Sequence, residues 1–148
     1  MRRLMHALML LLSATYASAQ ARPAPPRALA ADAPNVEFEM MTWPEVKQAL
    51  ASGKTTALVY TGGTEQRGPQ NIIAGHNYIG REVVKHIAEK LGNAIAMPVL
   101  PFTPAQADPE NPGNIDLPAG TLAMVLENIS EGAIANGFKN VEIGRAHV

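Results

Sequence analysis

The sequence predicts an α/β fold in three layers, in which helices cover both faces of a mainly parallel β-sheet. Short apolar runs alternate with longer segments whose apolar residues recur every three or four positions, as strands alternate with amphipathic helices. The chain has 148 residues, of which 47% are hydrophobic and 17% charged, which is enough apolar surface for one core. The 12 glycines and 12 prolines indicate many turns and argue against a helical bundle.

The charge and the cysteine count exclude several classes of protein. The formal net charge is −1, so the composition does not indicate a nucleic-acid partner. Cysteine is absent, which excludes disulfides, thiolate zinc sites and a cysteine nucleophile. Any metal site in this chain must therefore use histidine, aspartate or glutamate.

The amino-terminal residues read as a targeting signal and a tether. Residues 1–19 form a basic start, an apolar stretch and a small-x-small cleavage site, the layout of a secretory signal peptide. An uncleaved anchor stays open as the alternative. Residues 20–35 are rich in Ala and Pro and are interpreted as a linker. We expect an exported, periplasmic protein that has no contact with the membrane after cleavage.

The folded part is expected over residues 36–141, and its first elements follow from local signals. Thr42, Pro44 and Glu45 form a capping-box pattern for a helix that ends near Ala51. Residues 55–61 are β-branched and apolar and predict a buried strand. Trp43 is interpreted as a core anchor of this region.

The remaining elements continue the alternation. Apolar residues every four positions predict a helix from Asn77 to Leu91, which Gly92 ends. A second strand is expected over 94–100, a second amphipathic helix over 121–136, and a third strand from Phe138. Ligand sites in parallel sheets lie beyond the carboxyl ends of the strands. The loops at 62–75 and 102–118 are therefore the candidate functional segments.

The last seven residues, 142–148, read EIGRAHV, which is the in-frame translation of a common sequencing-adaptor string. We interpret them as an artefact. The genuine sequence is then expected to stop at Val141, inside an incomplete domain, and we expect this fragment to be inactive.

Four ordered segments carry a resemblance to a known family. Residues 62–70, GGTEQRGPQ, resemble the signature of the creatininase (creatinine amidohydrolase) family, which is roughly G-S-x-E-Q-H-G-P-H. Residues 42–46, 111–117 and 137–141 resemble its entry helix, its P-G-T-I-S-L loop and the segment before its third strand. The resemblance covers residues 36–141 in the family's order.

The resemblance implies a creatininase-like α/β fold and metal-dependent hydrolysis of a C–N bond in a small amide or cyclic amide. It implies a divalent metal, zinc or manganese, a small-molecule substrate, and a homo-oligomer when the protein is full length. Glu65 matches the family's first carboxylate ligand, and His76 stands where the family has an aspartate ligand. These two are the candidate metal ligands, and the catalytic residues stay unassigned.

Two positions depart from the family pattern. Arg67 replaces the first histidine ligand, and a guanidinium has no lone pair for a metal. Arg67 is instead a candidate substrate-binding residue, because its planar fork fits a carboxylate or phosphate. Gln70 replaces the second histidine of the motif.

Less specific roles for these residues stay open. Glu65 could be a loop carboxylate paired with Arg67, His76 could order the loop at the start of a helix, and Arg67 could form a structural ion pair. The acidic residues of the 102–118 loop are interpreted as turn formers. Two functions therefore remain: a metal-dependent amidohydrolase, and a non-catalytic binding or assembly module with an arginine in place of a metal ligand.

Overall fold

The computed structural model describes residues 34–145, so the predicted signal peptide and nearly all of the linker lie outside the described residues. The chain forms a 3-10 helix, three α-helices and three strands in this range. In order they are η1 (Phe38–Met40), α1 (Trp43–Ala51), β1 (Thr56–Thr61), α2 (Gly75–Leu91), β2 (Ala94–Ala96), α3 (Ala119–Ala135) and β3 (Asn140–Arg145). None of the helices in this described part is long and apolar enough to cross a bilayer.

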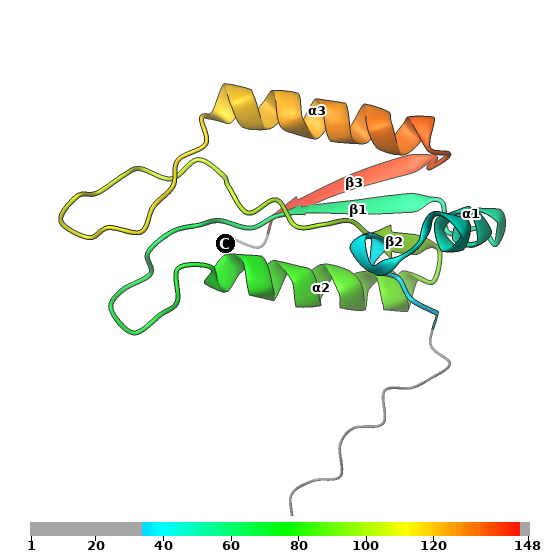
Figure 1. The fold of residues 1–148 in the computed structure, drawn as a ribbon, viewed down its shortest axis with the longest axis horizontal. Coiled ribbons are helices and arrows are strands. Elements are labelled where there is room, and N and C mark those ends of the chain that lie inside the picture. Colours follow the sequence, from blue (N-terminus) through cyan, green and yellow to red (C-terminus); the bar gives the residue numbers. More distant parts are fainter. Residues whose placement is uncertain (1–33, 146–148) are drawn as a thin grey trace, which may run out of the picture. The chain divides into compact units, whose positions relative to one another are not determined.

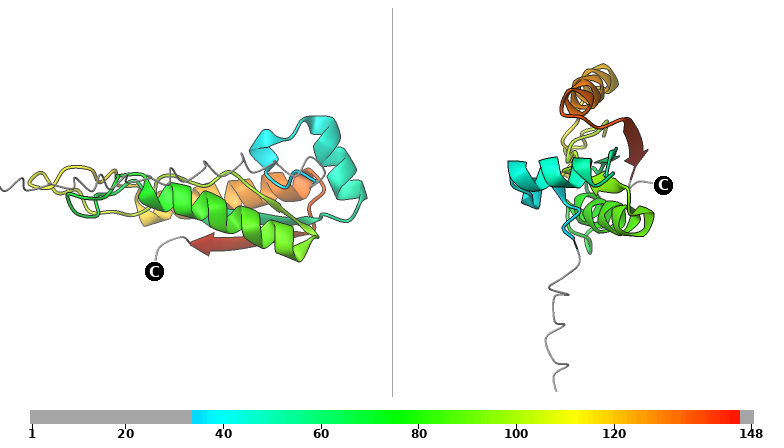
Figure 2. Two further views of the ribbon diagram at one scale, coloured as in Figure 1. Left: turned by 90° about the horizontal axis from the view of Figure 1, so that it is seen from below. Right: turned by 90° about the vertical axis from the view of Figure 1, so that its right-hand side faces the viewer.

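The sheet has the order β2-β1-β3, and both pairings are parallel. The central strand β1 is paired along its whole length with β3, from Thr56 opposite Asn140 to Thr61 opposite Arg145. Figure 1 shows α2 on one side of the strands and α3 on the other, and the end-on view of Figure 2 agrees. The predicted fold class, a parallel sheet with helices on both faces, is confirmed.

Alternation along β1 and β2 produces two apolar clusters, one on each face of the sheet. On one face, Leu58 packs with Val84 and Ala88 of α2. On the other face, Ala57 and Ile95 pack with Ala49 of α1, Ala133 of α3 and Phe138. Ala57 and Ile95 are fully buried. Because neighbouring strand residues point to opposite faces, a strand with both faces covered is apolar throughout.

The local signals at the ends of two helices have the predicted effect. The backbone N–H of Thr42 donates to the carboxylate of Glu45 at 2.6 Å, which is one half of the capping box at the start of α1. Gly92 ends α2 in the left-handed conformation, with φ of +75°, and its N–H donates to the carbonyl of Ala88.

Two sequence expectations differ from the structure. Strand β2 ends at Ala96 rather than Leu100, because its register with β1 shifts by one residue after this point: Leu58 is opposite Ala96, but Thr61 is opposite Leu100. Pairing resumes only at an isolated bridge between Thr61 and Leu100. The interpretation of Trp43 as a core anchor is wrong, since this residue is 78% exposed.

Residues 142–145 continue β3 beside β1. Parallel pairing uses backbone groups that every residue except proline carries. The adaptor interpretation of residues 142–148 therefore stays a prediction.

Candidate functional site

The predicted site loops lie together at the carboxyl ends of β1 and β2. Figure 1 shows the 62–74 loop and the 97–118 loop extending from the same end of the sheet, and Figure 2 shows them side by side from below. The connection from β1 to β2 runs over one face of the sheet through α2, and the connection from β2 to β3 runs over the other through α3. The loops that follow the neighbouring strands β1 and β2 therefore lead to opposite faces of the sheet. Ligands bind at such a point in open α/β sheets.

Two of the three predicted site residues are in contact. The Nδ1 atom of His76 lies 2.5 Å from Oε1 of Glu65, and their side chains are 7% and 20% exposed. His76 is in the first turn of α2, because this helix begins at Gly75, two residues earlier than the sequence predicts. The positive end of the helix dipole favours a carboxylate at this position. The contact joins the loop after β1 to the start of α2.

The third predicted residue, Arg67, is exposed and lies beside the start of α2. Its Nη1 atom is 3.3 Å from the position that a Cβ on Gly75 would occupy. The guanidinium is therefore next to the residue that precedes His76. A cation beside the amino terminus of a helix makes this edge of the site favourable for an anion.

Sequence reasoning missed the polar residues that hold the Glu65 loop in place. Asn77 accepts a hydrogen bond from the N–H of Gly63 at 2.8 Å. The N–H of Gln66 donates to Oδ1 of Asn114 at 2.7 Å, and the N–H of Ile115 donates to the carbonyl of Thr64 at 3.0 Å. These bonds connect the two site loops with each other and with α2. Asparagine immediately after His76, in the first turn of a helix, is the signal that could have identified Asn77.

Asp108 stabilises a turn in the second loop, as predicted, whereas Asp116 connects two separate segments of that loop. Asp108 accepts hydrogen bonds from the side chain of Asn111 and the N–H of Glu110, and these bonds hold its pKa below the ordinary value. Asp116 accepts a hydrogen bond from the N–H of Ala105 at 2.9 Å. Within residues 34–145 no group of three or more His, Asp or Glu side chains is arranged to hold a metal.

The donor set nevertheless suits a divalent cation in part. Glu65 offers a carboxylate and His76 an imidazole, which are ligand types that zinc and manganese accept. The two groups already meet in a mostly buried position, so little reorganisation is needed to bring them together. Catalytic zinc usually has three protein ligands, so the described residues supply part of a site.

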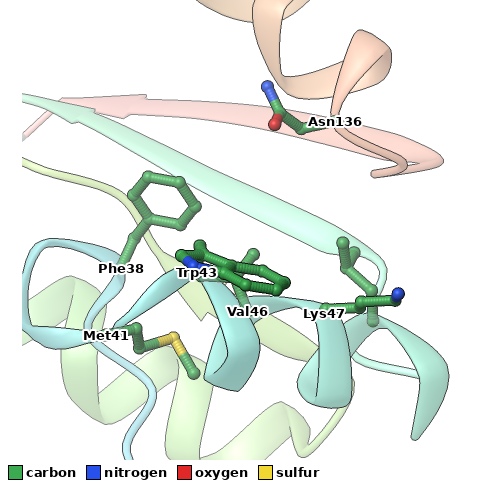
Figure 3. Close-up of a pocket in the computed structure, with 7 residues that line it drawn as sticks. Phe38, Met41, Trp43, Val46, Lys47 and Asn136 are labelled. Carbon is green, nitrogen blue, oxygen red and sulfur yellow. The ribbon is translucent and has the colours of Figure 1, made fainter.

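A separate hollow of about 490 Å³ lies between α1 and the end of α3. Its lining includes Phe38, Met41, Trp43, Lys47 and Asn136. Figure 3 shows the Trp43 indole between Phe38 and Lys47, with Asn136 on the opposite wall. This hollow is near the amino ends of β1 and β3, and the Glu65–His76 contact is beyond the carboxyl end of β1. The hollow and the contact are therefore separate features.

Comparisons of the chain with known proteins identify one family. A family model, Creatininase, described as creatinine amidohydrolase, matches residues 39–148. The crystal structure of a creatinine amidohydrolase (creatininase) is similar over 76% of this chain and 45% of its own, with 23% identity and a TM-score of 0.66. A search of curated proteins found no significant match.

Two further solved structures are forms with named metals. A zinc–zinc form of a creatininase mutant and a manganese creatininase each share 24% identity with 76% of this chain, with TM-scores of 0.66 and 0.65. The match covers 45% and 46% of those chains. The chain thus spans less than half the length of the structures that it resembles, and at these identities the likeness concerns the fold.

Proposed function

The chain belongs to the creatininase family, and on this premise we propose that it is a metal-dependent amidohydrolase acting on a C–N bond of a small amide or cyclic amide. The contact between Glu65 and His76 carries the proposal. It supports the proposal because it brings a carboxylate and an imidazole together beyond the carboxyl end of β1, where an α/β sheet places its ligands.

Glu65 and His76 would hold the divalent cation, with zinc and manganese as the candidates. Such an ion, when bound, polarises a carbonyl and lowers the pKa of a water molecule. Without it, the carboxylate and the imidazole hold each other in place at 2.5 Å. Cation binding then competes with a proton for the imidazole, so the affinity of the pair for metal falls as the pH is lowered. The proposal requires at least one further ligand outside this pair.

Arg67 would bind an anionic group of the substrate. Its guanidinium is exposed and lies beside the first turn of α2, one residue from His76. A planar fork of N–H donors fits a carboxylate in two parallel hydrogen bonds. Such a contact would orient a small substrate next to the ligand pair without contributing to the reaction itself.

A non-catalytic binding module is the second candidate, and the same residue favours it. Arg67 brings a permanent positive charge to the edge of the site, and this charge opposes a second cation close by. In this alternative the positive charge replaces a metal and the loop binds an anion or a partner protein.

The localisation and the partners of the protein are part of the proposal. Residues 1–19 support export to the periplasm by their signal-peptide pattern. A small-molecule substrate fits a site formed by two loops, and we propose a homo-oligomer for the full-length protein. Neither nucleic acid nor, after signal cleavage, a membrane is needed for the proposed activity.

Metal titration of the full-length protein tests the hydrolase proposal. Isothermal titration with ZnCl₂ and MnCl₂ is expected to show binding that Glu65→Gln and His76→Ala each weaken at least about tenfold. Glu110→Gln, which changes an exposed carboxylate of the other loop, is the matched control and is expected to leave the affinity unchanged. Absence of metal binding by the wild type at several pH values would count decisively against a hydrolase.

Anion titration separates the alternative from the hydrolase. The binding module predicts that inorganic phosphate or acetate binds to the wild type and that Arg67→Ala abolishes the binding. Metal-dependent turnover of a cyclic amide by the wild type would contradict the binding module. Arg67→Lys keeps the charge and loses the planar fork, so it distinguishes bidentate recognition from simple attraction.

A further inference from the structure

We infer that Asn77 is a positioning residue, which fixes the loop carrying Glu65 against the helix carrying His76. The inference rests on the proposed metal site. Asn77 directly follows His76 in α2. Its side chain contacts Gly63 and Thr64, the two residues that precede Glu65. A single amide therefore connects the two segments that bring the candidate ligands together.

The hydrogen bonds of Asn77 define the orientation of its amide. Its Oδ1 accepts from the N–H of Gly63 at 2.8 Å, and its Nδ2 lies 3.5 Å from Oγ1 of Thr64. The hydroxyl of Thr64 donates in turn to the carbonyl of Pro101 at 2.7 Å. The amide thus begins a chain of contacts that runs from α2 through the Glu65 loop into the loop after β2.

Packing at Gly62 depends on the position of the same amide. Gly62 lies so close to Asn77 that a Cβ on Gly62 would overlap the Oδ1 atom. The N–H of Gly62 also donates to the carbonyl of Leu100 at 2.9 Å, which holds the end of β1 in place. Any side chain at position 62 would therefore displace the Asn77 amide from Gly63.

The amide of Asn77 is used by the loop. Asn77 is the third residue of α2, and its Oδ1 accepts the N–H of Gly63, which belongs to the loop that carries Glu65. The side chain therefore connects the first turn of the helix with that loop.

The alternative is that Asn77 only contributes to stability. A structural residue lowers the free energy of unfolding when it is lost and leaves the affinity of the folded protein for metal unchanged. A positioning residue lowers the affinity itself, and removing the groups that orient metal ligands typically costs 10-fold to 100-fold. Zinc affinity and urea unfolding of the same variants therefore distinguish the two roles.

The test uses the full-length protein, ZnCl₂ as the probe and two variants that break the same contact from opposite sides. Asn77→Leu removes both amide groups, and Gly62→Ala displaces the amide with a Cβ that also lies 3.0 Å from Cα of Asn77. Both are expected to weaken zinc binding at least 10-fold and to speed hydrogen exchange of the Gly63 amide. Asn77→Asp keeps the acceptor for Gly63, so it is expected to keep that amide protected and to bind zinc no more than 3-fold more weakly.

Two matched controls lie on α3, away from the site. Asn128→Leu removes an amide that donates to the carbonyl of Met124 within its own helix. Gly132→Ala adds a Cβ that meets no atom within 4 Å. Both controls are expected to bind zinc as the wild type does.

The outcomes separate the two proposals. Equal zinc affinity in the wild type and in Asn77→Leu, with faster exchange at Gly63, overturns the positioning role alone. Absence of zinc binding by the wild type overturns the metal site and this inference with it. If Asn77→Leu does not fold, a large loss of affinity in the folded Asn77→Asp variant, with Gly63 still protected, contradicts the inference.

Discussion

The imidazole of His76 and the carboxylate of Glu65 face each other at 2.5 Å, although one residue belongs to a helix and the other to a loop. Each group compensates the burial of the other, because a polar group buried without a partner is costly. The contact therefore orders the loop in addition to grouping two candidate ligands.

Loss of His76 is expected to destabilise the protein. His76→Ala leaves the mostly buried Glu65 carboxylate without its imidazole partner, and we expect a loss of about 1–3 kcal/mol in the free energy of unfolding by urea. His86→Ala is the matched control, because that imidazole is 62% exposed and pairs with Glu89 on the surface of α2. If His76→Ala lowers the free energy of unfolding no more than His86→Ala does, the contact does not stabilise the fold.

The ion cluster around Glu37 predicts an acid-sensitive contribution to stability. Partial burial raises the pKa of Glu37, but hydrogen bonds and charges from Arg81 and Lys85 outweigh this effect and hold the pKa below its ordinary value. The unfolded chain then binds a proton more readily, so this contribution is present at neutral pH and disappears as the pH falls through the folded-state pKa.

Glu37→Gln tests that assignment. The variant is expected to be less stable than the wild type at pH 7, and the difference is expected to shrink as the pH falls through the lowered pKa of Glu37. Urea unfolding at a series of pH values measures it, with Glu131→Gln on the exposed side of α3 as the control. A difference that does not depend on pH would show that Glu37 acts through packing rather than through charge.

A substitution at Gly113 is expected to disturb the site loops. Gly113 has φ of +144°, and a Cβ there would press against Ile73 and lie 3.2 Å from Cβ of Gln66. Gly113→Ala is expected to cost about 1–3 kcal/mol. Gly120→Ala in the first turn of α3, where a Cβ meets no atom within 4 Å, is expected to be neutral or stabilising. Similar unfolding midpoints for the two variants would contradict this prediction.

The exposure of Trp43 predicts a small effect on stability. Trp43→Ala is expected to change the free energy of unfolding by less than about 1 kcal/mol, as surface substitutions usually do. Phe138→Ala is the contrast, because Phe138 is buried between α1 and the sheet and the loss of a buried aromatic costs about 3–5 kcal/mol. A comparable loss of unfolding free energy in both variants would show that Trp43 contributes to the core.

The sequence predicts the elements and the end of the sheet that carries the site, because these depend on local signals. The capping pair of Thr42 and Glu45, the stop at Gly92 and the apolar period of α2 act within a few residues. The grouping of Glu65 with His76 was predicted from a family resemblance, which carries information about tertiary structure that no local signal contains.

The parts that the sequence did not predict depend on contacts between distant residues. The exposure of Trp43 is decided by which side of α1 meets the sheet, and an aromatic residue fits either side. The role of Asn77 depends on the N–H of Gly63, which lies on another element. Strand β2 is short because its register with β1 shifts by one residue between Ala96 and Leu100, and this register is a relationship between two strands.

The central position of β1 has a consequence for how the chain folds. Lys54 and Gly92, next to the β1–β2 pair, are 38 positions apart, whereas Thr56 and Asn140 in the β1–β3 pair are 84 apart. Closing the longer loop costs about 0.7 kcal/mol more in chain entropy, so the unit of β1, α2 and β2 is expected to assemble first. Until β3 arrives, one edge of β1 has unpaired backbone groups. In that interval a second chain can pair with β1, which makes docking of β3 the step at which misassembly competes with folding.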